Sequence, residues 1–396
     1  MLSDQARASL EKQHYKIVGS HSAVKTCGWT KNMINGQGGC YKLKFYGIMS
    51  NQCMQMTTSI SCANRCTFCW RDYKAPTSKE WKWEVDDPGF ILENSIKAHH
   101  GLLVGFNGSD KANKKIYELS KTVKHVALSL TGEPIIYPKI NEIIMKFHEN
   151  GISTFMVTNA QYPDQIRDLA PVTQLYISLD APTKDLLKKI DIPLFSDYWE
   201  RLNQSLDFMA QKKQRTTIRL TIVKGLNDGD IPEYAKMIMK GDPDFLEIKS
   251  YMFIGASRQR LKKENMPLHE EIVEFTKMLM LNLPDYEIVT DHVPSRVVMC
   301  AKKKFKIDGK WHTWIDFPKF AELALSGKEF GTMDYLKITP APGLSGKGTL
   351  DRWKEWQEKK AAKKAMQEKM AKSEKQSNEI KVDEKTDELS FYKDQS

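Results

Sequence analysis

The sequence predicts an α/β protein whose short strands form one mainly parallel sheet. Three observations favour this fold class. Apolar strand candidates and amphipathic helix candidates alternate from residue 125 onward. Repeated strand–helix units favour parallel strands joined by right-handed crossovers. The chain has 396 residues, enough for one large barrel-like domain or two ordinary ones.

Each element of this alternation follows from a local pattern. The chain opens with an amphipathic helix over 3–15 and a strand-like stretch over 41–46. Later strands are expected at 125–130, 153–157, 174–179, 216–223, 245–251 and 286–289. The helices between them are expected at 137–149, 163–169, 184–189, 197–212, 231–240 and 268–281.

Composition divides the chain into four parts. We expect an N-terminal extension over 1–60, a barrel over 61–290, a separate C-terminal region over 291–350, and a charged tail over 351–396 that is solvated or disordered. The tail is nearly neutral, so the body carries most of the net charge of +10. A basic body suggests a polyanionic partner such as nucleic acid, although solubility alone also explains it.

The cysteines are expected to be reduced. The sequence shows no apolar run of about 18 residues and no apolar segment near its start, which predicts no membrane span, no signal peptide and a cytoplasmic location. Thiols stay reduced there, so the seven cysteines indicate ligands rather than disulfides. Cys300 lies apart from the others and is expected to be a packed thiol.

The densest motif is Cys62, Cys66 and Cys69, spaced Cys-x3-Cys-x2-Cys. Three thiolates in one short loop can hold a single metal centre. A structural zinc site usually has four protein ligands, whereas three cysteines leave one iron of a four-iron cluster open. A zinc site, or a disulfide with a spare thiol, is the alternative. With Phe68 before the third cysteine, the motif resembles the signature of radical S-adenosylmethionine enzymes.

This resemblance implies a partial (β/α)6 barrel in which the open iron binds the amino and carboxylate groups of S-adenosylmethionine. One electron then cleaves the sulfonium to a 5′-deoxyadenosyl radical. The turn with Gly132 and Glu133 resembles the family turn that holds the amino group, with Thr131 in place of its first glycine. Polar residues at later strand ends are further cofactor-binding candidates, with helix capping as the alternative: Asn159, Ser178 and Asp180.

A second cysteine series makes the resemblance more specific. Cys27, Cys40 and Cys53 follow one another at two equal gaps of twelve residues. Together with the first motif, they resemble the tRNA 4-demethylwyosine synthase family, over roughly residues 20–350. The resemblance implies that these cysteines hold a second [4Fe–4S] cluster. It also implies that Lys42 forms a Schiff base with pyruvate, with Lys44 as the close competitor on the same face of the expected strand.

The activity implied by the resemblance is a carbon–carbon lyase reaction on tRNA-Phe. N1-methylguanosine beside the anticodon, at position 37, loses a methyl hydrogen, gains two carbons of pyruvate with loss of carbon dioxide, and closes a third ring. We expect no flavodoxin-like domain ahead of the barrel, so the chain resembles the short archaeal form of the family. A separate electron-donor protein is therefore expected, and we expect a monomer. Another two-cluster radical S-adenosylmethionine maturase, or a non-catalytic iron–sulfur protein that binds nucleic acid, stays as an alternative.

Two stretches are candidates for RNA contact, because loop bases stack on aromatic rings and arginine. One directly follows the first cysteine motif. The other is the basic run 302–306, for which a solvated charge run with core tryptophans is the alternative. The residues concerned are Trp70, Arg71, Tyr73 and Lys74 in the first stretch and Trp311 and Trp314 beside the second. Four residues on later strands are expected to line the barrel mouth: Arg219, Thr221, Lys249 and Tyr251.

Overall fold

The structure is a computed structural model that describes residues 2, 4–72, 74–345 and 366. Contacts between Cα atoms divide the chain into two units, Met1–Ser345 and Gly346–Ser396. Apart from Met366, the expected tail over 351–396 lies outside the described residues, as does Tyr73.

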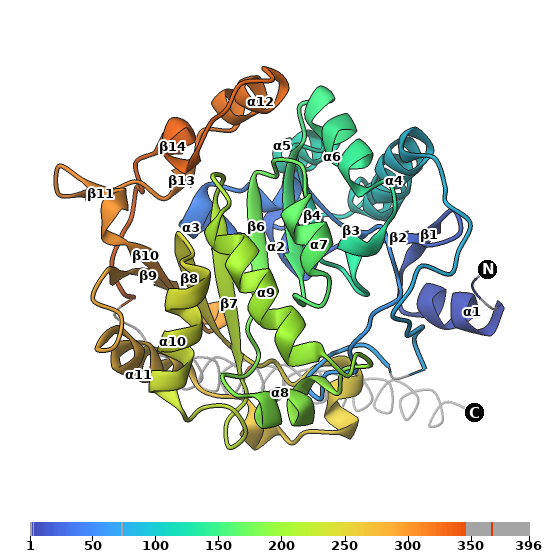
Figure 1. The fold of residues 1–396 in the computed structure, drawn as a ribbon. Coiled ribbons are helices and arrows are strands. Elements are labelled where there is room, and N and C mark those ends of the chain that lie inside the picture. The colour runs from blue at the N-terminus through green and yellow to red at the C-terminus, as the bar shows by residue number, and fades with distance from the viewer. Residues whose placement is uncertain (1, 3, 73, 346–365, 367–396) are drawn as a thin grey trace, which may run out of the picture. The chain divides into compact units, whose positions relative to one another are not determined.

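A ten-stranded sheet forms the centre of the first unit (Figure 1). Its strand order is β1-β2-β3-β4-β5-β6-β7-β8-β10-β9. The six strands β3 to β8 are parallel to one another, which confirms the expected partial barrel of six parallel strands. The strands span Lys16–Val18 (β1), Ser22–Val24 (β2), Cys53–Thr57 (β3), His125–Leu128 (β4), Ser153–Thr158 (β5), Gln174–Ser178 (β6), Thr216–Ile222 (β7), Phe245–Ser250 (β8), Tyr286–His292 (β9) and Val297–Lys302 (β10).

Helices cover the outer side of the sheet (Figure 1). The α-helices span Asp4–Lys12 (α1), Gly28–Ile34 (α2), Tyr41–Tyr46 (α3), Pro88–Leu103 (α4), Lys114–Ser120 (α5), Ile140–Glu149 (α6), Pro163–Arg167 (α7), Lys184–Asp191 (α8), Tyr198–Ala210 (α9), Ile231–Gly241 (α10), His269–Met280 (α11) and Phe317–Leu325 (α12). Side chains on one face of the parallel strands, such as Met156 and Ile177, join helix residues such as Phe147 and Leu206 in the larger core. None of the helices in the described part of the chain is both long and apolar enough to cross a membrane.

The other face of the strands carries a second core. Phe155, Tyr176 and Phe245 point to this side, as expected for residues whose neighbours along each strand face the helices. Helix α3 and the segment after β10 pack against them. That segment includes four short strands: Lys306–Ile307 (β11), Lys310–Trp311 (β12), Trp314–Ile315 (β13) and Leu336–Lys337 (β14). The inner side of the sheet is therefore closed by chain from both ends of the sequence.

The strand expected at 41–46 is wrong, because these residues form helix α3. Tyr41 and Phe45 are four residues apart, lie on one helical face, and pack edge-to-face at 5.3 Å between ring centroids. Gly47 then ends the helix in a left-handed conformation with φ of 81°. Burial of the aromatic face decided the local structure, whereas alternation of polar and apolar residues alone had suggested a strand.

The sheet also ends differently from the expected order. The strand expected at 286–289 exists as β9, but β10 runs antiparallel between it and β8. The outer side of β9 is in turn paired, because the Gly343 amide donates to Val289 O at 2.7 Å and Gly343 forms a parallel bridge with Thr290. The division of the body into 1–60, 61–290 and 291–350 stays a prediction.

Candidate active site

The loop that carries Cys62, Cys66 and Cys69 begins beyond the carboxyl end of β3 and is held by the end of α8. The amide of Arg65 donates to Asp191 O at 2.9 Å, and the amide of Thr67 donates to Ile190 O at 2.8 Å. Asn64 adds a side-chain bond to the Asp191 carboxylate at 3.1 Å. These bonds fix the cysteine loop to a part of the chain more than 120 residues away.

Two arginines bind the carbonyl groups of the same loop. The buried guanidinium of Arg71 donates to Asn64 O at 3.2 Å and to Ile60 O at 3.3 Å. Arg260 reaches back from the chain after β8 and donates to Thr67 O at 2.9 Å and to Cys69 O. Because a guanidinium presents several donors in a rigid plane, each arginine can fix more than one carbonyl of the loop.

The three thiols of this loop suit a cluster better than a single zinc ion. Within the described part of the chain, one trio of possible ligand atoms lies within 4.8 Å of one another, and it belongs to Cys66, Asp180 and Asp191. The Sγ atoms of Cys62, Cys66 and Cys69 therefore do not all lie within 4.8 Å of one another, whereas a tetrahedral zinc ion with Zn–S bonds of about 2.3 Å would hold its sulfur ligands closer together than that. Hydrogen bonds from the Asn64 amide and the Asn159 side chain, both at 3.4 Å, reach Cys62 Sγ. Such donors suit a thiolate bound to iron.

Burial favours the protonated form of the Cys62 and Cys66 thiols. It raises the pKa of Cys62 to about 11 and the pKa of Cys66 well above its ordinary value. Only a thiolate binds a metal, so cluster binding must release these protons.

The turn with Gly132 and Glu133 lies directly against the cysteine loop. Gly132 has φ of +68°, and a Cβ at this position would lie 2.0 Å from Ser59 O. The Glu133 amide donates to Ser61 O at 2.7 Å. Glu133 is 2% exposed, and burial raises its pKa to about 7. One carboxylate oxygen accepts from the Asn159 amide at 3.1 Å, while Oε1 has no partner among the described residues.

An unpartnered buried carboxylate oxygen fits the ammonium group of an amino-acid ligand. Glu133 and Asn159 meet directly, and Asn159 also reaches Cys62. The structure therefore brings together three residues that the sequence had offered separately as cofactor and metal ligands.

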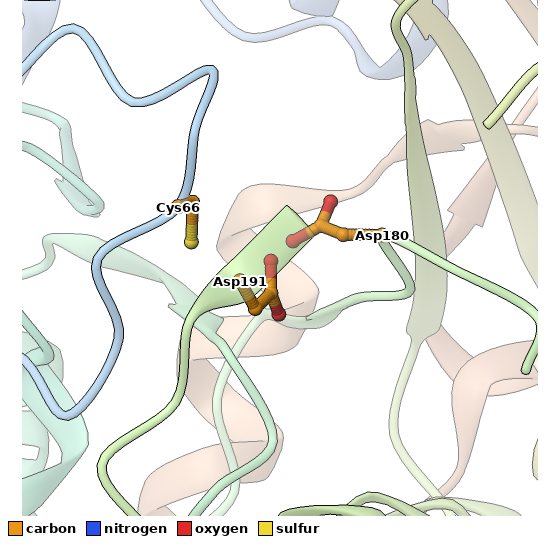
Figure 2. Close-up of side chains that lie close together, drawn as sticks. All are labelled: Cys66, Asp180 and Asp191. Carbon is orange, nitrogen blue, oxygen red and sulfur yellow. The ribbon is translucent and has the colours of Figure 1, made fainter. Parts of the chain in front are cut away.

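Asp180 lies near Asp191 and Cys66 of the cysteine loop (Figure 2). Its carboxylate approaches that of Asp191 and the thiol of Cys66 within 4.8 Å. Burial raises the pKa of Asp180, and the neighbouring Asp191 raises it further. Ser178 ends β6, is half-buried, and pairs with Arg219 of β7 in the sheet. Among the described residues, no hydrogen bond joins its side chain to this group.

The second cysteine series occupies the starts of three elements. Cys27 precedes α2, Cys40 precedes α3, and Cys53 is the first residue of β3. Burial raises the pKa of Cys40 to about 11 and of Cys53 to about 12, and mutual thiolate repulsion contributes in both cases. The two cysteine groups therefore lie toward opposite ends of β3, one at its start and one beyond its end.

Lys42 and Lys44 differ in surroundings, because α3 turns them to different faces. Lys44 forms an ion pair with Asp291 at 3.5 Å and donates to Asp291 O at 2.8 Å. Lys42 Nζ lies 5.0 Å from the ring centroid of Tyr176 and 5.7 Å from that of Phe155. Among the described residues, no carboxylate pairs with the Lys42 amine.

A buried polar network lies beside Lys42. Arg219 pairs with Glu247 at 2.9 Å, and the hydroxyl groups of Tyr41 and Tyr46 also donate to this carboxylate. Lys249 is on the same strand as Glu247, and its Nζ donates to Ser295 O at 3.2 Å. Burial, with the charge of Arg219, lowers the pKa of Lys249 to about 8. Arg219 and Lys249 thus lie close together, whereas Tyr251 is buried and its hydroxyl donates to Ser257. That all four residues line the barrel mouth stays a prediction.

The second basic and aromatic stretch does not form a free patch. Lys302, Lys304 and Lys306 pair with acidic side chains of Asp242, Asp244 and Glu287. Trp311 is buried, and Trp314 donates to Lys44 O at 3.0 Å. The stretch is closer to the alternative of a solvated charge run with core tryptophans, although three of its lysines are paired and Trp314 is only half-buried. In the first stretch, Trp70 stacks on Tyr15 and Arg71 is buried in the loop.

Sequence reasoning missed Asp191 and Arg260 as neighbours of the cysteine loop. Asp191 lies within a charged helical pattern, and Arg260 within an irregular stretch rich in basic residues. Neither carries a motif, and only the tertiary fold reveals their contacts with the loop.

The sequence matches two family models. A model described as "Radical SAM superfamily" matches residues 56–238, and one described as "Wyosine base formation" matches residues 240–302. The S-adenosyl-L-methionine-dependent tRNA 4-demethylwyosine synthase TYW1 of Mus musculus is 47% identical over 353 residues, which are 87% of this chain and 49% of that protein. The synthase of Oryza sativa subsp. japonica is 48% identical over 349 residues, which are 87% of this chain and 53% of that protein.

Two solved structures are similar over nearly their whole length. One is a structure of TYW1 with a lysine-pyruvate adduct bound, at 38% identity and a TM-score of 0.70, covering 77% of this chain and 97% of that chain. The other is a crystal structure of archaeal TYW1, at 35% identity and a TM-score of 0.64, covering 78% of this chain and 99% of that chain. The chain thus spans about half the length of the curated relatives it matches.

Proposed function

Because the chain belongs to the tRNA 4-demethylwyosine synthase family of radical S-adenosylmethionine proteins, we propose that it builds the tricyclic base 4-demethylwyosine on tRNA. The substrate is tRNA-Phe that carries N1-methylguanosine at position 37, and the second substrate is pyruvate. The products include carbon dioxide and water. Cleavage of the carbon–carbon bond of pyruvate that releases carbon dioxide makes the protein a carbon–carbon lyase. A neighbouring solved structure contains a lysine-pyruvate adduct, which supports pyruvate as the source of the added carbons.

Two sets of residues would hold the cofactors. Cys62, Cys66 and Cys69 would bind one [4Fe–4S] cluster, and Cys27, Cys40 and Cys53 a second. The free Oε1 of Glu133 would accept the amino group of S-adenosylmethionine, with Gly132 and Asn159 holding that carboxylate in place. Asp180 and Ser178 are proposed to meet the ribose. When bound, this cofactor set supplies the radical that removes hydrogen from the N1-methyl group.

Lys42 is the residue that we assign to pyruvate, and its position carries the proposal. Its amine lies over the rings of Tyr176 and Phe155 without an ion-pair partner among the described residues. The amine nitrogen attacks the ketone carbon of pyruvate, and the ketone oxygen leaves as water to give an imine. Lys44 suits this role less well, because Asp291 already holds its ammonium group.

The remaining partners follow from the same proposal. The excess of basic over acidic residues favours a polyanion such as tRNA. The exposed Lys74, close after the cysteine loop, is a proposed contact to the anticodon loop. We also propose that a separate protein supplies the electrons and that the chain acts as a monomer in the cytoplasm.

Mass spectrometry of tRNA nucleosides tests the proposal. Anaerobically reconstituted protein is incubated with S-adenosylmethionine, dithionite, pyruvate and tRNA-Phe that bears N1-methylguanosine. A tricyclic base that forms only with pyruvate is the expected result. If 5′-deoxyadenosine forms while the tRNA stays unchanged, the substrate assignment is wrong and a maturase with another substrate becomes the better explanation. If neither forms despite a full iron load, the non-catalytic alternative is favoured.

A further inference from the structure

We propose that Lys249 binds the carboxylate of the 2-oxo acid whose ketone condenses with Lys42. This inference rests on the proposed function and adds a second contact to the same substrate. It concerns a residue on β8, far in sequence from the cysteines and from Lys42.

The position of Lys249 leaves its charge available to a ligand. The side chain is half-buried near the carboxyl end of β8, and its Nζ makes one hydrogen bond, to Ser295 O. Among the described residues, no carboxylate lies within ion-pair distance of this amine. An ammonium group that is partly removed from water gains much from an anionic partner, because screening by solvent is weak there.

The neighbouring residues make this region suitable for an anion. Lys42 Nζ and the Arg219 guanidinium lie 5.0 and 4.8 Å from the same ring centroid of Tyr176. Lys249 Nζ lies 6.0 Å from the ring centroid of Tyr41, whose hydroxyl accepts from Arg219 at 3.0 Å. The three cationic side chains therefore lie beside the rings of Tyr176 and Tyr41.

The carboxylate of Glu247 does not by itself neutralise the charges of Lys42, Arg219 and Lys249. Its oxygens accept from Arg219 and from two tyrosine hydroxyls. Glu247 is thus occupied by Arg219, which leaves the amines of Lys42 and Lys249 without an acidic partner among the described residues. Two lysines whose amines lack a carboxylate partner suit a molecule with two different acceptor groups.

A short 2-oxo acid has these two groups on adjacent carbons. The ketone carbon reacts with one amine, and the carboxylate next to it needs a cation. The imine on Lys42 forms with loss of water and keeps that carboxylate, so Lys249 would bind it before and after condensation. Two-point binding also orients the ketone for attack, which lowers the entropic cost of the reaction.

The charges of Lys42 and Lys249 also act on the thiol of Cys40. A competing explanation is therefore that Lys249 only balances the charge of a cluster. The two explanations differ in what they predict for a substrate that lacks the carboxylate charge, which the following experiment uses.

The test measures trapping of a ketone on the anaerobically reconstituted full-length protein. Borohydride reduces the imine, and intact mass spectrometry gives the trapped fraction as a function of ketone concentration. Pyruvate is compared with its neutral methyl ester for the unsubstituted protein, Lys249→Met, Lys249→Arg and Lys224→Met. Lys224 is the control, because it is a half-exposed lysine whose amine is already paired with Glu271.

We expect Lys249→Met to raise the half-saturating pyruvate concentration at least tenfold, which is about 1.4 kcal/mol. Lys249→Arg should keep it within about threefold, since the charge is retained, and Lys224→Met should leave it unchanged. With methyl pyruvate, all four proteins should behave alike. Iron content and the electron paramagnetic resonance spectrum, measured on each preparation, should be the same for all four.

Three results overturn the inference. One is an unchanged half-saturation for pyruvate in Lys249→Met, with or without an altered cluster spectrum. Another is an equal loss for pyruvate and its methyl ester, which would indicate a structural role. The third is the absence of any adduct on the unsubstituted protein. That result refutes the Lys42 step of the proposed function itself, and is thereby distinguished from the first two.

Discussion

Replacing Gly132 by alanine tests the close contact between the Gly132–Glu133 turn and the cysteine loop. A Cβ at this position would lie 2.0 Å from Ser59 O, 2.7 Å from the Ile60 carbonyl carbon and 2.8 Å from Ser61 O. All three are main-chain atoms, so a side-chain rotation cannot relieve the clash. The turn must move away from the loop, and the hydrogen bond from the Glu133 amide to Ser61 O is then lost.

The magnitude follows from two contributions. A left-handed conformation costs alanine roughly 1–2 kcal/mol relative to glycine. The broken buried hydrogen bond adds roughly 1–3 kcal/mol. Gly151 provides the control, because its φ is +66° and nothing lies within 4 Å of its hypothetical Cβ. Gly151→Ala should therefore show the first contribution alone.

Urea denaturation of both variants measures the difference, which we expect to be about 1–3 kcal/mol in the free energy of unfolding. The same preparations, reconstituted with iron and sulfide, are titrated with S-adenosylmethionine by calorimetry. Displacement of Glu133 should weaken binding about tenfold or more in Gly132→Ala and leave it unchanged in Gly151→Ala. Equal unfolding free energies and equal affinities for the two variants would refute the reasoning.

Three further predictions concern other parts of the chain. Cys40→Ala should lower the iron content from about eight to about four per chain, while Cys300→Ala, at a fully buried thiol, should leave it unchanged; iron analysis that shows no loss for Cys40→Ala contradicts a second cluster. Lys44→Met should cost up to about 1 kcal/mol of stability, because its 3.5 Å ion pair joins a partly exposed lysine to a buried carboxylate that keeps His269 and Ser345 as partners. It should keep the borohydride-trapped adduct, whereas Lys42→Met should lose it; mass spectra with the opposite result would assign the imine to Lys44. Burial lowers the pKa of His125 to about 3, below the unfolded value of about 6.5, so the unfolded state takes up the proton first and stability falls as pH decreases from about 6.5. His125→Gln should remove up to about 1.4 kcal/mol per pH unit of this fall between pH 6 and 4. If urea titrations give the same dependence of unfolding free energy on pH for both proteins, the assignment is wrong.

The repeating part of the fold was accessible from sequence. The strands β4 to β8 are apolar stretches bounded by polar turns, and their helices carry clear amphipathic patterns. Beyond this part, sequence reasoning was weaker. Alternation in the segment Tyr41–Tyr46 suggested a strand, but a helix buries its aromatic residues together. The helix α4, Pro88–Leu103, was not predicted, although Asp87 caps its start at Gly89 N and Phe90 N.

The candidate site shows the same division. Spacing located the cysteines, and strand-end position located Glu133 and Asn159, because parallel strands bring their carboxyl ends to one edge. Asp191 and Arg260 act through contacts between distant segments, and spacing carries no information about those. The position of β10 between β8 and β9 depends on which strands pair with each other. An apolar stretch such as Val297–Lys302 does not specify its neighbours in the sheet.

The pairing of Gly343 with β9 has a consequence for how copies of the chain meet. A sheet edge with unpaired amides and carbonyls invites a strand from another molecule and, in the end, aggregation. One edge of this sheet is the three-residue strand β1, which is too short to offer many unpaired amides and carbonyls. The other is β9, seven residues long, and Gly343 pairs with Val289 and Thr290 at its middle. The amide of Ser345 also binds the Asp291 side chain. By pairing with β9, the segment around Gly343 disfavours edge-to-edge association of two chains.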